Sequence, residues 1–167
     1  MVSPAPRRRV ARADARREVA MRSARELVEQ QYVMLRQRDL ARLPELYADD
    51  AFYSMPGLTV RPIELPALLR AWAGAFPDLR TEPTGLVDTA GGVVVEQRMT
   101  ATHTGALHTP LGTVAPTGRR VSWDVVDVVR ARHGLIASWR SYFDQGLLLA
   151  DLGWRPEPTT VATPLAA

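Results

Sequence analysis

The chain has 167 residues with a net charge of +3, and all 21 of its basic residues are arginine. This length suits one domain that buries a core and still encloses a pocket, while the absence of cysteine and lysine excludes disulfides, sulfur-ligated metal and Schiff-base catalysis. The charge is uneven, because residues 1–25 hold eight arginines against two carboxylates, which leaves −3 on the remainder.

The basic N-terminal segment, residues 1–22, predicts a flexible extension that precedes the folded domain. Attachment of this segment to nucleic acid or to an anionic surface is the alternative, although we expect no nucleic-acid partner. The sequence contains no signal-peptide pattern and no apolar run of the roughly 18 residues that span a bilayer. We therefore expect no membrane contact and a cytoplasmic location.

The first half of the domain, which we expect over residues 23–154, has helical periodicity. Ser23 and Glu26 form a capping-box pattern, and apolar residues follow at helical spacing to about Gln37. A short helix over 40–47, a brief strand over 51–53 and a third helix over 64–76 complete this half.

The second half has the alternation of β-strands. We predict strands over 80–88, 93–103, 120–130 and 135–143, with a looser stretch over 105–115. Asp144 then caps a closing helix, and residues 155–167 form a loose tail. Because helices and strands are segregated along the chain, the predicted fold class is α+β.

Asp127 is the most informative residue of the sequence. A strand of period two places it on one face with Val121, Trp123, Val125 and Val129. A carboxylate on an apolar face has to be paired, hydrated or partly protonated, because removing the charge from water is costly. Groups placed in this way often serve in proton transfer, so Asp127 is a candidate catalytic residue. The alternative is a structural aspartate that pairs with a buried arginine or a backbone group.

His103 is the second candidate catalytic residue. It shares one strand face with Gln97 and Met99, where its imidazole could hold a carbonyl oxygen or orient Asp127 from a neighbouring strand. A core histidine satisfied by a local partner fits the same pattern.

Aromatic and polar side chains on these faces, and on the elements that close the domain, are candidate walls of a substrate pocket, although such residues also fill ordinary cores. They are Tyr32, Tyr53, Trp72, Gln97, Met99, Trp123 and Trp139. The sequence has no metal-binding histidine pattern and no phosphate-binding or dinucleotide-binding loop, so we expect no metal and no cofactor.

Several short motifs follow one another in a fixed order. They are Phe76-Pro77-Asp78-Leu79-Arg80, Thr102-His103-Thr104-Gly105, Pro116-Thr117-Gly118-Arg119-Arg120-Val121, the Asp127 strand, Gly134-Leu135-Ile136 and Tyr142-Phe143-Asp144. In this order they resemble the SnoaL-like polyketide cyclases, which belong to the superfamily named after nuclear transport factor 2. The resemblance covers residues 23–154. It implies a cone-shaped fold in which a curved antiparallel sheet wraps around the N-terminal helices and a deep apolar pocket.

The resemblance also implies a reaction: the intramolecular aldol closure of a small hydrophobic polyketide-like ester, or a related acid/base isomerisation, in natural-product biosynthesis without a cofactor. An aspartate that faces the pocket acts as general acid and base, and Asp127 is the matching position. Since the reacting carbon lies between carbonyls and is already acidic, confinement and one proton shuttle suffice. Cyclases with a histidine partner place it near the 105–115 stretch, so His103, His108 or neither of them fills this role. We expect a homodimer or higher homo-oligomer.

Two other functions remain open, because one fold can carry unrelated activities. A hydrolase of the limonene-epoxide type would need an arginine that bridges two pocket carboxylates, yet Arg98 and Arg130 fall on the outer strand faces. A ligand-binding or assembly module without chemistry would place Asp127 in an ion pair and fill the pocket with its own side chains.

Overall fold

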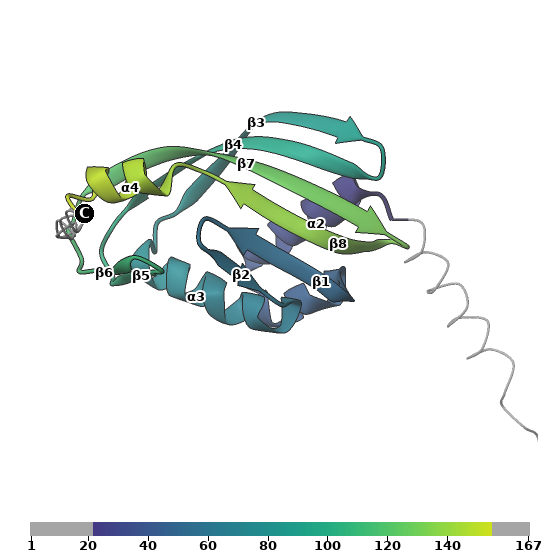
Figure 1. Cartoon of the computed structure of the whole chain (residues 1–167), viewed down its shortest axis with the longest axis horizontal. Coiled ribbons are helices and arrows are strands. Elements are labelled where there is room, and N and C mark those ends of the chain that lie inside the picture. Colours follow the sequence, from purple (N-terminus) through teal and green to yellow (C-terminus); the bar gives the residue numbers. More distant parts are fainter. Residues whose placement is uncertain (1–21, 155–167) are drawn as a thin grey trace, which may run out of the picture.

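The computed structural model describes residues 22–154, which form a strongly curved sheet with helices packed against its inner face (Figure 1). Apart from Arg22, the predicted extension over residues 1–22 lies outside the described residues, and so does the predicted tail over residues 155–167. The predicted α+β class is confirmed.

The first helix of the described residues, α2 (Ala24–Gln37), begins at the predicted capping box. The backbone N–H of Ser23 donates to the carboxylate of Glu26 at 2.7 Å, and the N–H of Glu26 donates back to the serine hydroxyl at 3.2 Å. The buried stripe of this helix then packs against β4, β7 and β8, which are defined below. Local sequence therefore sets both where the helix starts and which face it buries.

The other predicted helices also lie at their predicted positions. A 3-10 helix, η1 (Leu40–Leu46), and a 3-10 turn that the sequence did not predict, η2 (Pro62–Glu64), precede α3 (Leu65–Ala75). The closing helix α4 (Gln145–Asp151) has Asp144 as its N-cap, because the Asp144 carboxylate accepts a hydrogen bond from the N–H of Leu147 at 2.8 Å. The predicted capping role of Asp144 is thus confirmed.

Six strands form the main sheet, in the order β2-β1-β8-β7-β4-β3, and two more form a separate hairpin. The strands are β1 (Tyr47–Met55), β2 (Leu58–Val60), β3 (Arg80–Thr89), β4 (Gly92–Thr102), β5 (Leu107–Thr109), β6 (Gly112–Val114), β7 (Arg120–Arg132) and β8 (Leu135–Tyr142). The four long strands pair antiparallel as predicted.

One feature of the sheet was not predicted, and one expectation needs correction. Beside the four antiparallel long strands, β1 pairs with β8 in the parallel direction. These two strands are far apart in the chain, so no short hairpin fixes their relative direction. The stretch 105–115 is not loose: it contains the β5–β6 hairpin, which buries Leu107 and Val114. Pro110 and Gly112 divide this stretch into segments too short to show alternation in the sequence.

The interior consists of two hydrophobic clusters. The first, here called the α2 cluster, contains buried residues of α2, η1 and the near ends of β4, β7 and β8, among them Leu27, Leu43, Val95, Val129, Ile136 and Trp139. The second, the α4 cluster, lies toward the other end of β4 and β7 and contains Phe76, Ala101, Leu107, Trp123, Val125 and Leu148. β4 and β7 therefore contribute apolar residues to both clusters, whereas β8 contributes only to the α2 cluster.

Candidate active site

A polar layer crosses three neighbouring strands between the two hydrophobic clusters. It consists of Gln97 on β4, Asp127 on β7 and Ser141 on β8, with exposed fractions of 2%, 2% and 8%. Ser141 is the cross-strand partner of Asp127, and Gln97 lies diagonally opposite, two residues beyond the β4 partner Val95. On β7, Val129 belongs to the α2 cluster and residue 125 to the α4 cluster, so Asp127 lies at their boundary.

Two chains of hydrogen bonds end at the Asp127 carboxylate. In the first, the Tyr32 hydroxyl donates to Gln97 Oε1 at 2.8 Å, and Gln97 Nε2 donates to Asp127 Oδ2 at 2.6 Å. In the second, Ser141 Oγ donates to Asp127 Oδ1 at 2.5 Å, and the Tyr53 hydroxyl lies 3.0 Å from Ser141 Oγ. Since the serine proton is directed at the carboxylate, Tyr53 donates to the serine. Every donor in the network thus points toward one acidic group.

The surroundings of Asp127 favour its neutral form more than water does. Burial raises its pKa to about 6, while the donors Ser141, Trp139 and Gln97 oppose this by stabilising the charge. The buried indole N–H of Trp139 meets no partner at hydrogen-bond geometry, so its influence is that of a nearby dipole. None of the ion pairs among residues 22–154 includes Asp127. The carboxylate is therefore stabilised by neutral donors alone.

Three of the predicted wall residues surround this carboxylate. Trp139 packs edge-to-face on Tyr32, with ring centroids 6.2 Å apart, and stacks on Tyr53 at 6.4 Å. Burial is the main cause that raises the pKa of both phenols above the usual range, so they keep their protons at neutral pH. The space beside Asp127 is accordingly occupied by the protein's own aromatic rings.

Gln97 lies in the polar layer itself, and the remaining three predicted wall residues, Trp72, Met99 and Trp123, lie in or against the α4 cluster. Trp72 and Trp123 are 6.4 Å apart between ring centroids, and Met99 is the cross-strand partner of Trp123. Trp72 also stacks on Phe76 at 5.7 Å. The predicted wall is therefore divided between the two ends of the sheet.

His103 lies in the α4 half of the molecule and does not orient Asp127. The β4 partner of Asp127 is Val95, and His103 lies eight residues further along the chain, about 26 Å for extended backbone. The His103 ring is fully buried beside Phe76, with Nδ1 3.1 Å from Thr117 Oγ1 and Nε2 without a partner. Burial lowers its pKa. The expectation that His103 orients Asp127 is wrong, because two residues that alternation assigns to the same face can still lie far apart along the strands.

His108 does not replace it beside the carboxylate. It is exposed on the β5–β6 hairpin, where its Nδ1 lies 2.9 Å from Thr113 Oγ1. Ser141 is the polar neighbour that the sequence reasoning missed. The available signal was its position between Trp139 and Phe143 on the inward face of the last strand.

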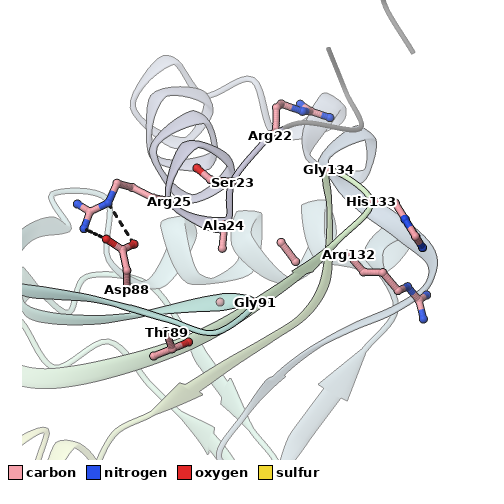
Figure 2. A pocket seen from close by; sticks show the side chains of 12 residues that line it. Arg22, Ser23, Ala24, Arg25, Asp88, Thr89, Gly91, Arg132, His133 and Gly134 are labelled. Carbon is pink, nitrogen blue, oxygen red and sulfur yellow. Dashed lines mark hydrogen bonds and ion pairs between the residues drawn. The ribbon is translucent and has the colours of Figure 1, made fainter. Parts of the chain in front are cut away.

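A hollow of about 440 Å³ lies beside Ser23, Asp88 and Gly134 (Figure 2). It is bordered by the N-terminus of α2 and by the turns between β3 and β4 and between β7 and β8, and the Arg25–Asp88 ion pair lies at its edge. None of the nine predicted site residues lines it. The hollow is therefore separate from the predicted pocket.

Two further observations concern residues 22–154. Within this range no three histidine, aspartate or glutamate side chains come together as a metal-binding group would require. The helices found there are too short or too polar to cross a bilayer.

The sequence of residues 26–152 matches the family described as SnoaL-like polyketide cyclase. Since this match covers most of the chain, the protein belongs to that family, which is typically enzymatic. Its fold is shared with a protein from Burkholderia pseudomallei described as like nuclear transport factor 2. Among proteins with curated descriptions, none matches this chain.

Solved structures from several bacteria share the fold. AclR from Streptomyces galilaeus, provisionally described as a hydroxylase, is 26% identical, with a TM-score of 0.66 over 80% of this chain and 97% of that one. IdmH from Streptomyces antibioticus, provisionally described as a polyketide cyclase, is 23% identical, with a TM-score of 0.61 over 78% and 99%. A LEH-like epoxide hydrolase from M. tuberculosis is 20% identical, with a TM-score of 0.55 over 81% and 90%.

Proposed function

We propose that this protein is a cofactor-independent cyclase that closes a ring by intramolecular aldol addition, with Asp127 as the general acid and base. The substrate is a small hydrophobic molecule with a carbon between two carbonyls and a third carbonyl within reach. Membership of the SnoaL-like family supports this class of reaction. The observation that carries the proposal is a fully buried carboxylate with neutral donors on both oxygens and a pKa raised to about 6.

The raised pKa suits both halves of the reaction. As a carboxylate, Asp127 accepts the C–H proton from the carbon between the carbonyls, and the resulting carbanion forms the new carbon–carbon bond. As a carboxylic acid, it then returns this proton to the alkoxide made from the attacked carbonyl. A group with a pKa near the working pH is effective in both directions, because neither form is rare.

The neutral surroundings of Asp127 distinguish this proposal from its two alternatives. An epoxide hydrolase of the limonene type needs an arginine between two carboxylates, whereas Arg98 pairs with Asp124 on the outer face of the sheet at 2.8 Å. A purely structural aspartate would favour a cation as partner, and the described ion pairs give Asp127 none. The aromatic rings that occupy the interior beside it are the feature that favours a module without chemistry.

The test compares two aspartates on the same strand. Asp127→Asn removes the titrating group, and Asp124→Asn removes an exposed carboxylate three residues away. The probe is a synthetic aryl β-keto ester that carries a ketone placed for ring closure, and product is followed by mass spectrometry. We expect Asp127→Asn to lower kcat by about 10²–10⁴ with an unchanged circular dichroism spectrum, and Asp124→Asn to keep wild-type turnover. Undiminished closure by Asp127→Asn would refute the assignment.

A further inference from the structure

The two hydrogen-bonded branches at Asp127 differ in what they can transport. The Gln97 branch contains a carboxamide, which donates through nitrogen and accepts through oxygen but does not pass a proton from one atom to the other. The Ser141 branch contains only hydroxyl groups, each of which can accept one proton while it releases another. Only the second branch can therefore move a proton to or from the carboxylate.

The same difference decides which carboxylate oxygen can carry the proton. A proton on Oδ2 would face the Gln97 Nε2 donor, so the amide would have to turn around and the Tyr32 hydroxyl would have to change from donor to acceptor. A proton on Oδ1 requires only that Ser141 and Tyr53 rotate their hydroxyls, because the contact between these two can run in either direction. The neutral acid is thus accommodated on the serine side.

Each branch ends in a tyrosine that lies nearer the surface than the carboxylate. Asp127, Gln97 and Ser141 are buried, whereas Tyr32 and Tyr53 are mostly buried residues that retain some exposed surface. The carboxylate is sealed behind its partners, and the outermost hydroxyl on the branch that conducts protons is that of Tyr53.

We propose that Ser141 and Tyr53 form a hydroxyl relay between Asp127 and the substrate, so that Tyr53 rather than the carboxylate contacts the substrate oxygen. This inference rests on the proposed function. In the acid step the Oδ1 proton passes to Ser141 Oγ, the serine proton passes to the Tyr53 oxygen, and the tyrosine proton passes to the alkoxide. One alkoxide is neutralised and one carboxylate is formed, so protons and charge balance. In the base step the transfers run in the opposite direction: the C–H proton passes to the Tyr53 oxygen, and a proton reaches Asp127 Oδ1 through Ser141. Neither hydroxyl needs to exist as an anion when the transfers are concerted.

Four variants separate the relay from simple packing. Ser141→Ala and Tyr53→Phe break it, while Ser141→Thr keeps a hydroxyl at the same position. Tyr142→Phe is the matched control for the tyrosine, because Tyr142 neighbours Ser141 on β8 but is 55% exposed on the outer face.

The first readout needs no substrate: the pKa of Asp127, measured by carbon-13 NMR of the labelled carboxylate. The titratable groups that act on it are the phenols of Tyr32 on α2 and of Tyr47 and Tyr53 on β1, all with raised pKa values, so they stay neutral during this titration. We expect Ser141→Ala to raise the Asp127 pKa, Ser141→Thr to restore it and Tyr142→Phe to leave it unchanged. An unchanged pKa in Ser141→Ala would overturn the relay.

The second readout is closure of the keto ester probe as a function of pH. We expect Ser141→Ala and Tyr53→Phe to lower kcat by about 10²–10⁴ with a much smaller change in KM, and Ser141→Thr to recover most of the loss. Full activity of Tyr53→Phe together with an inactive Asp127→Asn would overturn the relay and leave the proposed function standing. An active Asp127→Asn would instead refute the proposed function. The Asp127 pKa in Ser141→Ala would then still show whether Ser141 donates to the carboxylate.

Discussion

Ser141 lies opposite Asp127 because the pairing of β7 with β8 shifts by one residue. This shift occurs between the β7–β8 turn and the Asp127–Ser141 pair. Near the turn Arg132 pairs with Leu135, and a regular ladder would continue to place Arg140 opposite Asp127. The irregularity between Arg130 and Ala131 shifts the partner of Asp127 by one position, from Arg140 to Ser141. A neutral hydroxyl therefore replaces a guanidinium beside the carboxylate, which is what allows the Asp127 pKa to rise to about 6.

The first prediction concerns stability and pH. Because the pKa of Asp127 is raised in the folded protein from its usual 3.8, the folded state binds more protons than the unfolded state between pH 4 and pH 6. The free energy of unfolding should fall through this window as pH rises, by about 3 kcal/mol from this group. Denaturant unfolding of Asp127→Asn should lack that component. Equal pH dependence in the variant and the wild type would contradict the raised pKa.

The second prediction concerns the amide that holds the other carboxylate oxygen. Gln97→Leu leaves the Tyr32 hydroxyl and Asp127 Oδ2 without their partner, so we expect a loss of about 1–3 kcal/mol in unfolding free energy. It should also raise the Asp127 pKa, because a donor to the charged form is lost.

A second glutamine provides the control for this change. Gln31 is buried and accepts a hydrogen bond from the Tyr47 hydroxyl at 2.8 Å, away from the carboxylate's own donors. Gln31→Leu should show a comparable loss of stability with the Asp127 pKa kept. If both variants shifted that pKa equally, the effect would come from general loosening of the core.

The third prediction concerns His103 and acid. Burial lowers the pKa of His103 in the folded state, so the unfolded chain takes up the proton first as pH falls below about 6.5. The His103 contribution to stability is therefore present at pH 8 and is lost on acidification. His103→Leu removes both the titrating group and its unpartnered Nε2. When the pH is lowered from 8 to 5, the unfolding free energy of this variant should therefore fall by less than that of the wild type. Chemical denaturation at the two pH values measures this; parallel losses would show that His103 is not the acid-sensitive group.

The fourth prediction concerns a close approach of two backbone segments. A Cβ on Gly105 would overlap the carbonyl oxygen of Gly74, whereas a Cβ on Gly74 would meet open space. Gly105→Ala should therefore be destabilising by about 1–3 kcal/mol, in the manner of overpacked cores. Gly74→Ala lies in α3 and should stabilise by about 0.5–1 kcal/mol through helix propensity. Thermal melts of the two variants should move in opposite directions, and equal shifts would argue against this packing.

The sequence by itself determined what depends on near neighbours in the chain. The Ser23–Glu26 box starts α2, Asp144 caps α4, and period-two alternation places Asp127 on the buried face of β7. Such features are fixed by interactions within a few residues or by the pleat of a single strand, so a local pattern reveals them. The ordered motifs also indicated the family that the match over residues 26–152 establishes.

Tertiary structure alone decided which side chains meet. His103 follows the end of β4 and lies far along the sheet from Asp127, and β1 joins β8 in the parallel direction. The slip in the β7–β8 ladder chose Ser141 over Arg140 as the partner of Asp127. Register is the sum of pairings along a whole ladder, and one extra residue changes every later partner, so alternation within a strand cannot reveal it.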